Sequence, residues 1–307
     1  MPKWTVVTII SIQALLAVPA FAEPASSTPI EAASSPQPET AIPAPDGAAL
    51  SHAKLDKDLP QPLTTPSLGY VEGIFTDTGK MLVSPLHWET SDWLKAGLVA
   101  GVTGGFFLID ENIRDFAQSH KNAVANKVAT VGNDLGNPAY TLPPVGAFYL
   151  YGYLTKDEKA QTTALLAVES LAISSMFTEI IKVTADRERP STGAAPDQLH
   201  GPHLSLKNLS FSSGHTSSAF SIATVFAEQY KDNAYVPPVA YGLATLTGLS
   251  RIYGNEHWAS DVFFGAAIGY FVGKAVVKLH ATGTANKITV VPEVGSNYTG
   301  LSVQYKF

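Results

Sequence analysis

Long apolar runs with helical periodicity constrain the fold of this 307-residue chain more than any other feature. The longest occupies residues 160–183, and others occupy residues 91–109, 214–229, 236–249 and 261–279. Apolar side chains that recur every three or four residues favour helices, and such helices bury their apolar faces against one another. Because the chain has no cysteine, a hydrophobic core rather than disulfides must hold them together. We therefore predict an all-α fold, a helical bundle of about six core helices.

Caps and prolines predict where the helices begin and end. Ser91 is a plausible N-cap for the run that follows it, and Asp110 is expected to cap a separate short helix over residues 111–118. Another helix should then extend through residue 131. Pro143 and Pro144 interrupt the run over residues 140–154, so its helix should start at or after them. The helix over residues 160–183 should continue to Arg189 and stop at Pro190.

The two ends of the chain differ in composition from the helical part. Residues 1–22 are typical of a secretory signal peptide, with an alternative reading as an uncleaved membrane anchor. Residues 23–65 are rich in Pro, Ala and Ser and are predicted to be a disordered linker. A helical domain is expected over residues 66–284. Alternating apolar residues predict a short C-terminal β-hairpin within residues 285–307.

Basic residues in this mildly acidic chain can act only as small local clusters. The formal net charge is −6 and there is no basic tract, so a nucleic-acid partner is not expected. His257 and Asp261 are four residues apart, which places them on one face of a helical turn. The carboxylate can fix one imidazole nitrogen and leave the other as a base or nucleophile. Arg251 lies upstream and could hold an anion. Taken alone, such a pair is more often a surface contact.

Two further clusters carry groups that suit phosphate. Lys182 and Arg189 are seven residues apart, about two helical turns, so they should share a helix face. Ser213, Gly214 and His215 open the predicted helix over residues 214–229, where backbone N–H groups can bind an anion and the imidazole can donate a proton. In isolation the first cluster reads better as a solvated helix end, and the second reads better as an N-cap with an incidental histidine.

The three clusters together are far more specific. The segments Lys182-x6-Arg189-Pro190, Ser212-Ser213-Gly214-His215 and Ser250-Arg251-x5-His257-x3-Asp261 are separated by 21 and 34 residues. This order resembles the tripartite signature of the type 2 phosphatidic acid phosphatase and vanadium haloperoxidase superfamily, and the resemblance covers roughly residues 90–280. The family's second motif usually begins with proline, where this chain has Ser212. The loop is therefore expected to be less rigid, with its chemistry retained.

The resemblance implies a role for each matching residue. His257 would be the nucleophile that forms a phosphohistidine, Asp261 would orient it, and His215 would protonate the leaving group. The phosphoryl oxygens would be held by a further set: Lys182, Arg189, Ser213, Gly214 and Arg251. The implied activity is a metal-independent hydrolysis of phosphate monoesters or lipid (di)phosphates, with no cofactor and with vanadate as a possible phosphate mimic. The helical domain over residues 66–284 would then be the phosphatase domain.

Several alternatives remain open at this level. His200 and His203 could suggest a metal site in the loop over residues 191–211, but without a third ligand we prefer substrate contact or simple exposure. A vanadate-dependent haloperoxidase and a non-catalytic envelope protein are the competing functions. We favour a periplasmic, mostly soluble body with possible association with the membrane surface, because residues such as Glu169 interrupt the apolar runs. The alternative is an inner-membrane isoprenyl diphosphate phosphatase with a periplasmic active site.

Overall fold

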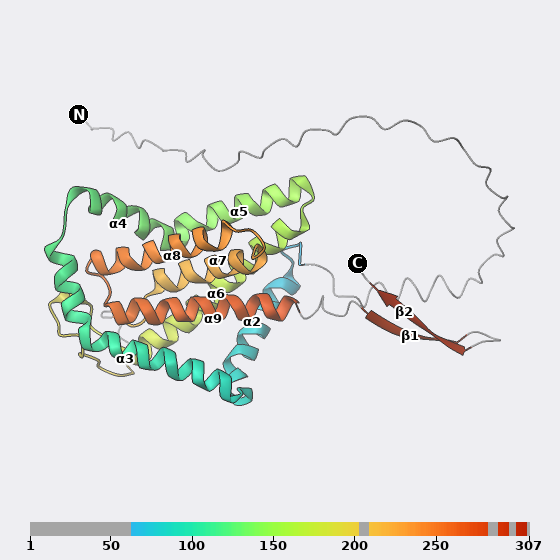
Figure 1. The fold of residues 1–307 in the computed structure, drawn as a ribbon, viewed down its shortest axis with the longest axis horizontal. Helices are drawn as coiled ribbons and strands as arrows, with labels where there is room; N and C mark the ends of the chain where they lie inside the picture. The colour runs from blue at the N-terminus through green and yellow to red at the C-terminus, as the bar shows by residue number, and fades with distance from the viewer. Residues whose placement is uncertain (1–62, 203–208, 282–287, 295–298, 306–307) are drawn as a thin grey trace. The chain divides into compact units, whose positions relative to one another are not determined.

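The computed structural model describes residues 63–202, 209–281, 288–294 and 299–305 (Figure 1). The predicted signal peptide and almost all of the predicted linker lie outside these residues. Within the described part, the elements follow one another in this order: α2 (Leu68–Val83), η1 (Ser84–His87), α3 (Thr90–Ser119), α4 (Ala123–Gly136), α5 (Pro138–Thr155), α6 (Glu158–Ala185), η2 (Pro190–Thr192), α7 (Gly214–Gln229), α8 (Val236–Tyr253), α9 (Ala259–Ala281), β1 (Ile288–Val294) and β2 (Thr299–Tyr305).

The helices form a bundle around α6, α7 and α9, which confirms the predicted all-α class. Helix α7 packs against α6, α8 and α9, and α4 and α5 cover α8 and α6 (Figure 1). The main core cluster consists of aliphatic side chains from α5, α6, α7 and α9: Val145, Ala164, Leu166, Ala167, Ile173, Val225, Val272 and Val276. Strands β1 and β2 pair antiparallel, with Ile288 opposite Tyr305. The predicted domain boundaries remain predictions.

Three glycines spaced four residues apart on α9 allow α7 to approach unusually closely. A Cβ atom on Gly269 would lie 2.3 Å from the Ser217 carbonyl oxygen, and one on Gly265 would lie 2.6 Å from the Ser213 carbonyl oxygen. On Gly273, the same atom would lie 2.7 Å from the Thr224 Cβ. Only hydrogen fits at such separations, so the two helix backbones are in direct contact. This packing holds the start of α7 against the start of α9.

Helix α3 differs from the prediction because it is continuous. The sequence suggested an N-cap at Ser91 and a new helix after Asp110, but one helix runs from Thr90 to Ser119 with Glu89 as its N-cap. Asp110 therefore lies inside a helix. Its side chain is buried, and its oxygens accept hydrogen bonds from Ser260 and Arg187, which belong to distant parts of the chain. Tertiary partners thus replace the local capping role that was predicted.

Two other predicted boundaries are also wrong. Helix α5 begins at Pro138, with Asn137 as its N-cap, and accommodates Pro143 and Pro144 within its length. Each of these two prolines lies past the first turn and removes one intrahelical hydrogen bond, yet the helix continues through both. Helix α6 ends at Ala185, where Asp186 adopts a left-handed conformation. Arg189 consequently lies beyond the helix and does not share a helix face with Lys182.

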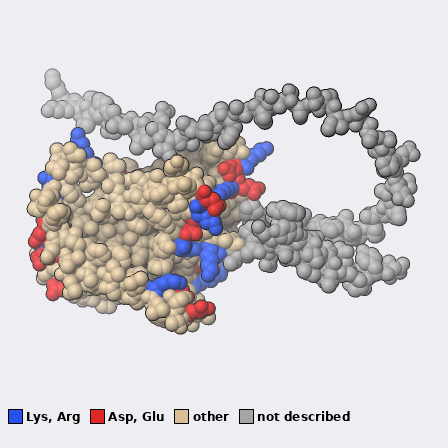
Figure 2. Space-filling model, viewed as in Figure 1, with Lys and Arg blue, Asp and Glu red and all other residues tan. Residues whose placement is uncertain are grey.

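The surface of the body favours a membrane protein. Helices α3, α6 and α9 are long and apolar enough to cross a membrane, and only 6% of the apolar window of α3 is buried. On the face shown in Figure 2, charged side chains gather towards the two ends of the body, with a largely uncharged surface between them. Glu169, used as an argument against a span, has a partner, because its carboxylate contacts the His280 imidazole. These findings support the inner-membrane alternative over the soluble body.

Candidate active site

His257 and Asp261 meet at the start of α9. The His257 side chain is 2% exposed, and its Nδ1 lies 3.6 Å from Oδ2 of Asp261, which is fully buried. His257 itself precedes the helix, while Asp261 sits in its first turn. Burial lowers the pKa of His257 below its ordinary value, and the nearby Asp261 opposes this only in part. The imidazole is therefore neutral near pH 7, with a lone pair available on one ring nitrogen.

The Asp261 carboxylate is held in place from three directions. Its Oδ2 accepts hydrogen bonds from the Ser210 hydroxyl at 2.6 Å and from the Trp258 backbone N–H at 2.8 Å. Its Oδ1 accepts a hydrogen bond from the Arg187 guanidinium. The Trp258 bond is an N-terminal cap of α9, which explains why a carboxylate suits this position. So many partners leave this carboxylate little freedom to turn away from His257.

Arg187 and Asp110 are buried residues that the sequence did not identify as functional. The Arg187 guanidinium donates to Asp261 and to Asp110, and both of its ion pairs have zero side-chain exposure. Its guanidinium also lies 3.9 Å above the centroid of the Phe107 ring. In the motif Lys182-x6-Arg189, Arg187 is one of the unspecified positions. Its place two residues before Arg189, a candidate phosphate ligand, is the feature of the sequence that could have indicated a role in the site.

The second cluster adjoins Lys182. Ser213 is the N-cap residue of α7, and its backbone N–H donates to the Asp261 carbonyl oxygen at 3.0 Å. A Cβ atom on Gly214 would lie 3.3 Å from Lys182 Nζ, so the ammonium group lies directly against the helix N-terminus. The same ammonium donates to Glu179 at 3.0 Å. A lysine and a helix N-terminus side by side form a site for an anion.

His215 lies in the field of several cationic groups. Burial lowers its pKa to about 4, and the neighbouring groups Arg251, His257, Lys182 and Arg189 contribute in the same direction. These contributions decay with distance, so all four groups lie near this imidazole. Residues from all three sequence clusters thus converge in space.

Arg189 and Arg251 share a carboxylate that the sequence did not predict. The Arg189 guanidinium contacts Oε2 of Glu256 at 2.5 Å, and the Arg251 guanidinium lies 3.5 Å from the same oxygen. Arg251 also donates to the Asn133 side chain from α4. Glu256 directly precedes His257. The sequence did not single it out, because a carboxylate repels phosphate and is not expected among phosphate ligands. In the structure it joins two of the predicted phosphate ligands.

The loop histidines do not form a metal site within the described residues. His200 lies on the surface, and its Nε2 is 3.2 Å from the Glu188 carboxylate. His203 falls outside the described residues. No group of three potential ligands that includes His200 occurs in the part of the chain that the structure describes. The His200 imidazole therefore contacts the Glu188 carboxylate and is not part of a predicted metal site within the described residues.

The segment of the chain that contains the three clusters resembles a known family. The model of the PAP2 superfamily matches residues 163–285, a range that contains all three clusters. Over these residues the chain is similar to the PAP2 superfamily. It is 30% identical over 171 residues to a lipid A 1-phosphatase of Porphyromonas gingivalis, an alignment that covers 55% of this chain and 34% of that protein.

Other PAP2 relatives are more distant. A PA-phosphatase related-family protein of Dictyostelium discoideum is 28% identical over 159 residues, covering 46% of this chain and 58% of that one. The chain therefore spans between about a third and three fifths of the length of these relatives. Among solved structures, a transmembrane PAP2 type phosphatidylglycerolphosphate phosphatase from Bacillus subtilis has a TM-score of 0.46 at 20% identity, covering 68% of this chain and 95% of that one. LpxE of Aquifex aeolicus has a TM-score of 0.42 at 22% identity, with coverages of 55% and 95%.

Proposed function

We propose that this PAP2-like protein is a membrane phosphatase that removes phosphate from a lipid through a phosphohistidine on His257, without a metal ion. The observation that carries the proposal is the neutral, buried imidazole of His257 beside a fixed carboxylate, in a region supplied with cations. Asp261 faces Nδ1, which leaves Nε2 as the attacking atom. The Arg187 and Asp110 pairs orient the carboxylate and have no contact with substrate.

The phosphate-binding groups act by electrostatic stabilisation. Lys182, Arg189 and Arg251 would surround the phosphoryl oxygens, and the N-terminus of α7 at Ser213 and Gly214 would add backbone donors. A phosphoryl group carries charge on three oxygens in its transition state, so fixed positive groups lower the barrier more than they strengthen ground-state binding. This arrangement can support the reaction with protein side chains alone.

His215 is assigned the role of general acid, and its low pKa sets a condition on that role. In the free protein, burial together with the nearby cations keeps the imidazole neutral. A bound phosphate dianion offsets those cations, so its arrival raises the pKa of His215 and favours protonation. Nε2 of His257 then attacks phosphorus, the bond to the leaving oxygen breaks, and His215 gives its proton to that oxygen. Neutral His215 next takes a proton from water, which attacks the phosphohistidine and releases inorganic phosphate.

Two observations support a lipid as the substrate. The relative from Porphyromonas gingivalis is named for its action on lipid A, and this chain has three helices of membrane-spanning length. We place the active site at the periplasmic face of the inner membrane. The chain has no cysteine, so Thr192→Cys, on the exposed η2 turn next to Arg189, gives a background-free reporter. Labelling by a membrane-impermeant maleimide in intact spheroplasts is expected, and labelling only after lysis would refute this orientation.

The catalytic assignment is tested by phosphate release from lipid phosphates, isoprenyl diphosphates, nucleotides and sugar phosphates. His257→Ala should abolish release, by at least about 10⁴-fold, because no other group can form the intermediate. His200→Ala, a histidine on the surface loop, is the matched control and should retain full activity. Brief incubation with radiolabelled substrate should give an acid-labile, base-stable phosphoprotein that His257→Ala lacks. Full activity of His257→Ala would refute the nucleophile.

The role of His215 is tested by the leaving group. His215→Ala should reduce turnover of an alkyl lipid phosphate by about 10²–10⁴-fold, because its leaving oxygen needs a proton. An activated aryl phosphate, whose leaving group departs without one, should lose much less. Equal losses on the two substrates would remove His215 as the general acid.

A further inference from the structure

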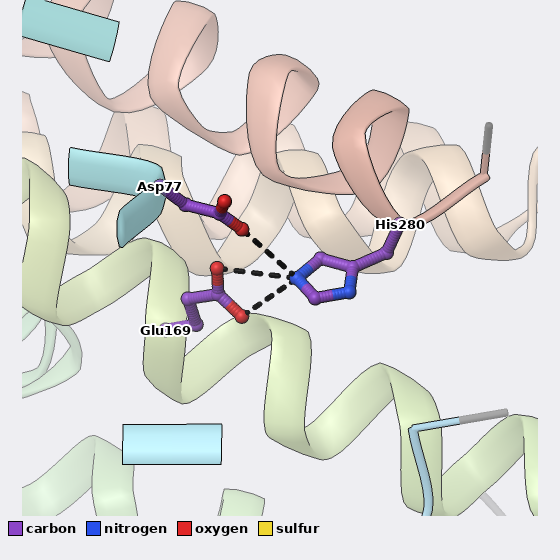
Figure 3. Close-up of side chains that lie close together, drawn as sticks. All are labelled: Asp77, Glu169 and His280. Carbon is purple, nitrogen blue, oxygen red and sulfur yellow. Dashed lines mark hydrogen bonds and ion pairs between the residues drawn. The ribbon is translucent and has the colours of Figure 1, made fainter. Parts of the chain in front are cut away.

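A second cluster of ligand-type side chains joins three helices away from the active site. Asp77 from α2, Glu169 from α6 and His280 from α9 point towards one another (Figure 3). The His280 Nε2 lies 3.0 Å and 3.2 Å from the two Glu169 carboxylate oxygens. It also lies 3.4 Å from Oδ2 of Asp77. Each residue offers one ligand atom, and the three atoms lie within 4.8 Å of one another.

The cluster contains two carboxylates in a buried position, where negative charge without a balancing cation is unfavourable. Glu169 is 1% exposed and Asp77 is 5% exposed, so both carboxylates have lost most of their hydration. Lys80 contacts only Oδ1 of Asp77 and is itself largely exposed, which leaves Oδ2 directed at the cluster. A divalent cation would balance both carboxylates at once.

Two of the spacings between ligand atoms, those from the imidazole nitrogen to the two carboxylates, are close to the spacing around a small tetrahedral ion. A Zn²⁺ ion with ligands at about 2.0–2.1 Å has about 3.3–3.4 Å between neighbouring ligand atoms. The distances of 3.0–3.4 Å from the imidazole nitrogen to the carboxylate oxygens fall close to this value. One imidazole with two carboxylates is also a ligand set that zinc accepts, with water in the fourth position. We propose that Asp77, Glu169 and His280 form a binding site for a divalent transition-metal ion of the zinc class.

This site is separate from the proposed catalysis. Glu169 precedes Lys182 by thirteen residues on α6, which corresponds to about 20 Å along the helix. His280 follows Asp261 by nineteen residues on α9, or about 28 Å. The ion would therefore join α2 to the core helices at the end of the bundle away from the active site. Its role would be to hold α2 in place, and the phosphoryl chemistry would remain metal-independent.

The test uses the full-length protein in detergent micelles, stripped with a chelator and titrated with Zn²⁺ by calorimetry. We expect one ion per chain with a Kd in the micromolar range or below. At zinc a hundredfold above Kd, the melting temperature should rise by about 5–10 °C. Co²⁺ should give the intense visible absorption of a tetrahedral complex. Glu169→Gln and His280→Gln should each weaken zinc binding by at least about 100-fold.

Control variants separate this site from nonspecific binding and from the proposed function. His120→Gln removes an exposed histidine at the C-cap of α3 and should bind zinc as the wild type does. Lys80→Gln, on an exposed side chain, should strengthen binding several-fold because it removes a cation next to Asp77. This variant also keeps the test valid if a buried substitution fails to fold. His257→Ala should bind zinc normally, so loss of catalysis and loss of the ion are separable.

Two results would overturn the proposal. One is the absence of zinc binding by the wild type at 100-fold molar excess over a micromolar protein concentration. The other is binding that persists unchanged in His280→Gln and Glu169→Gln. Either result would identify the cluster as an ion pair in which a proton on His280, and not a metal, balances Glu169.

Discussion

Replacing Glu256 by glutamine should improve substrate binding. The Glu256 carboxylate contacts the guanidinium groups of Arg189 and Arg251, which are both assigned to phosphate. A phosphate dianion and this carboxylate compete for the same donors. Glu256→Gln removes the competing charge and keeps the size of the side chain, so both arginines become more available to substrate.

The magnitude follows from the exposure of the two ion pairs. The Glu256 side chain is 41% exposed, so water screens both contacts, and each contributes about 0.5 kcal/mol. The longer contact, at 3.5 Å, is the weaker of the two. In the wild type, both contacts with Glu256 must break before substrate binds, which weakens the free energy of binding by about 1 kcal/mol. Their removal should lower KM about fivefold with kcat nearly unchanged, because the contacts with Glu256 are lost when substrate binds, before the chemical step.

The assay is phosphate release from a short-chain lipid phosphate in mixed micelles, over a range of substrate concentrations. Glu111→Gln is the matched control, since Glu111 forms an exposed ion pair with Arg114 at 3.0 Å on α3. This control should leave KM unchanged. A higher KM for Glu256→Gln would refute the reasoning, because it would mean that the carboxylate positions the arginines for substrate instead of competing with it.

Three further predictions concern stability. Asp110→Asn leaves the buried Arg187 with one carboxylate fewer and should lower the free energy of unfolding by about 3 kcal/mol, measured by denaturant titration in micelles, while also reducing kcat; an unchanged stability would contradict the buried network. Gly269→Ala forces a Cβ atom against the α7 backbone and should lower the melting temperature, whereas Gly101→Ala on α3, which meets nothing within 4 Å, should not. The pKa of His215 lies at about 4 in the folded protein and near 6.5 when unfolded, so the unfolded state binds more protons between these values. Stability should therefore fall as the pH drops from about 6.5 to about 4, and His215→Gln should flatten that slope; an equal slope in the variant would contradict the shift.

The sequence predicted best those parts of the site that follow local rules. The predicted helix over residues 214–229 coincides with α7. A turn of small residues marks its start, and the continuous apolar run that follows indicates its length. His257 and Asp261 meet as their spacing suggested, although His257 lies before the helix. The contact between Lys182 and Gly214 depends on the tertiary fold. The resemblance carried by the order of the three clusters nevertheless predicted that they meet.

The parts that the sequence missed depend on contacts between distant segments. Asp110 looked like a helix cap because nothing local shows that Arg187 lies opposite it. Glu169 looked like an isolated acid in an apolar run, since its partner His280 lies 111 positions later. Only tertiary structure brings such pairs together, and neither has a spacing that a helix or strand would produce.

Helix α3 combines two properties that are seldom found in one element. It has the least buried apolar window of the candidate spans, yet its Asp110 binds the Arg187 guanidinium that holds Asp261. A change in the tilt of this outer helix would be transmitted through one guanidinium to the orientation of the His257 ring. A mismatch between this helix and the thickness of a bilayer, which a helix can relieve by tilting, would thus influence how well the imidazole is aimed.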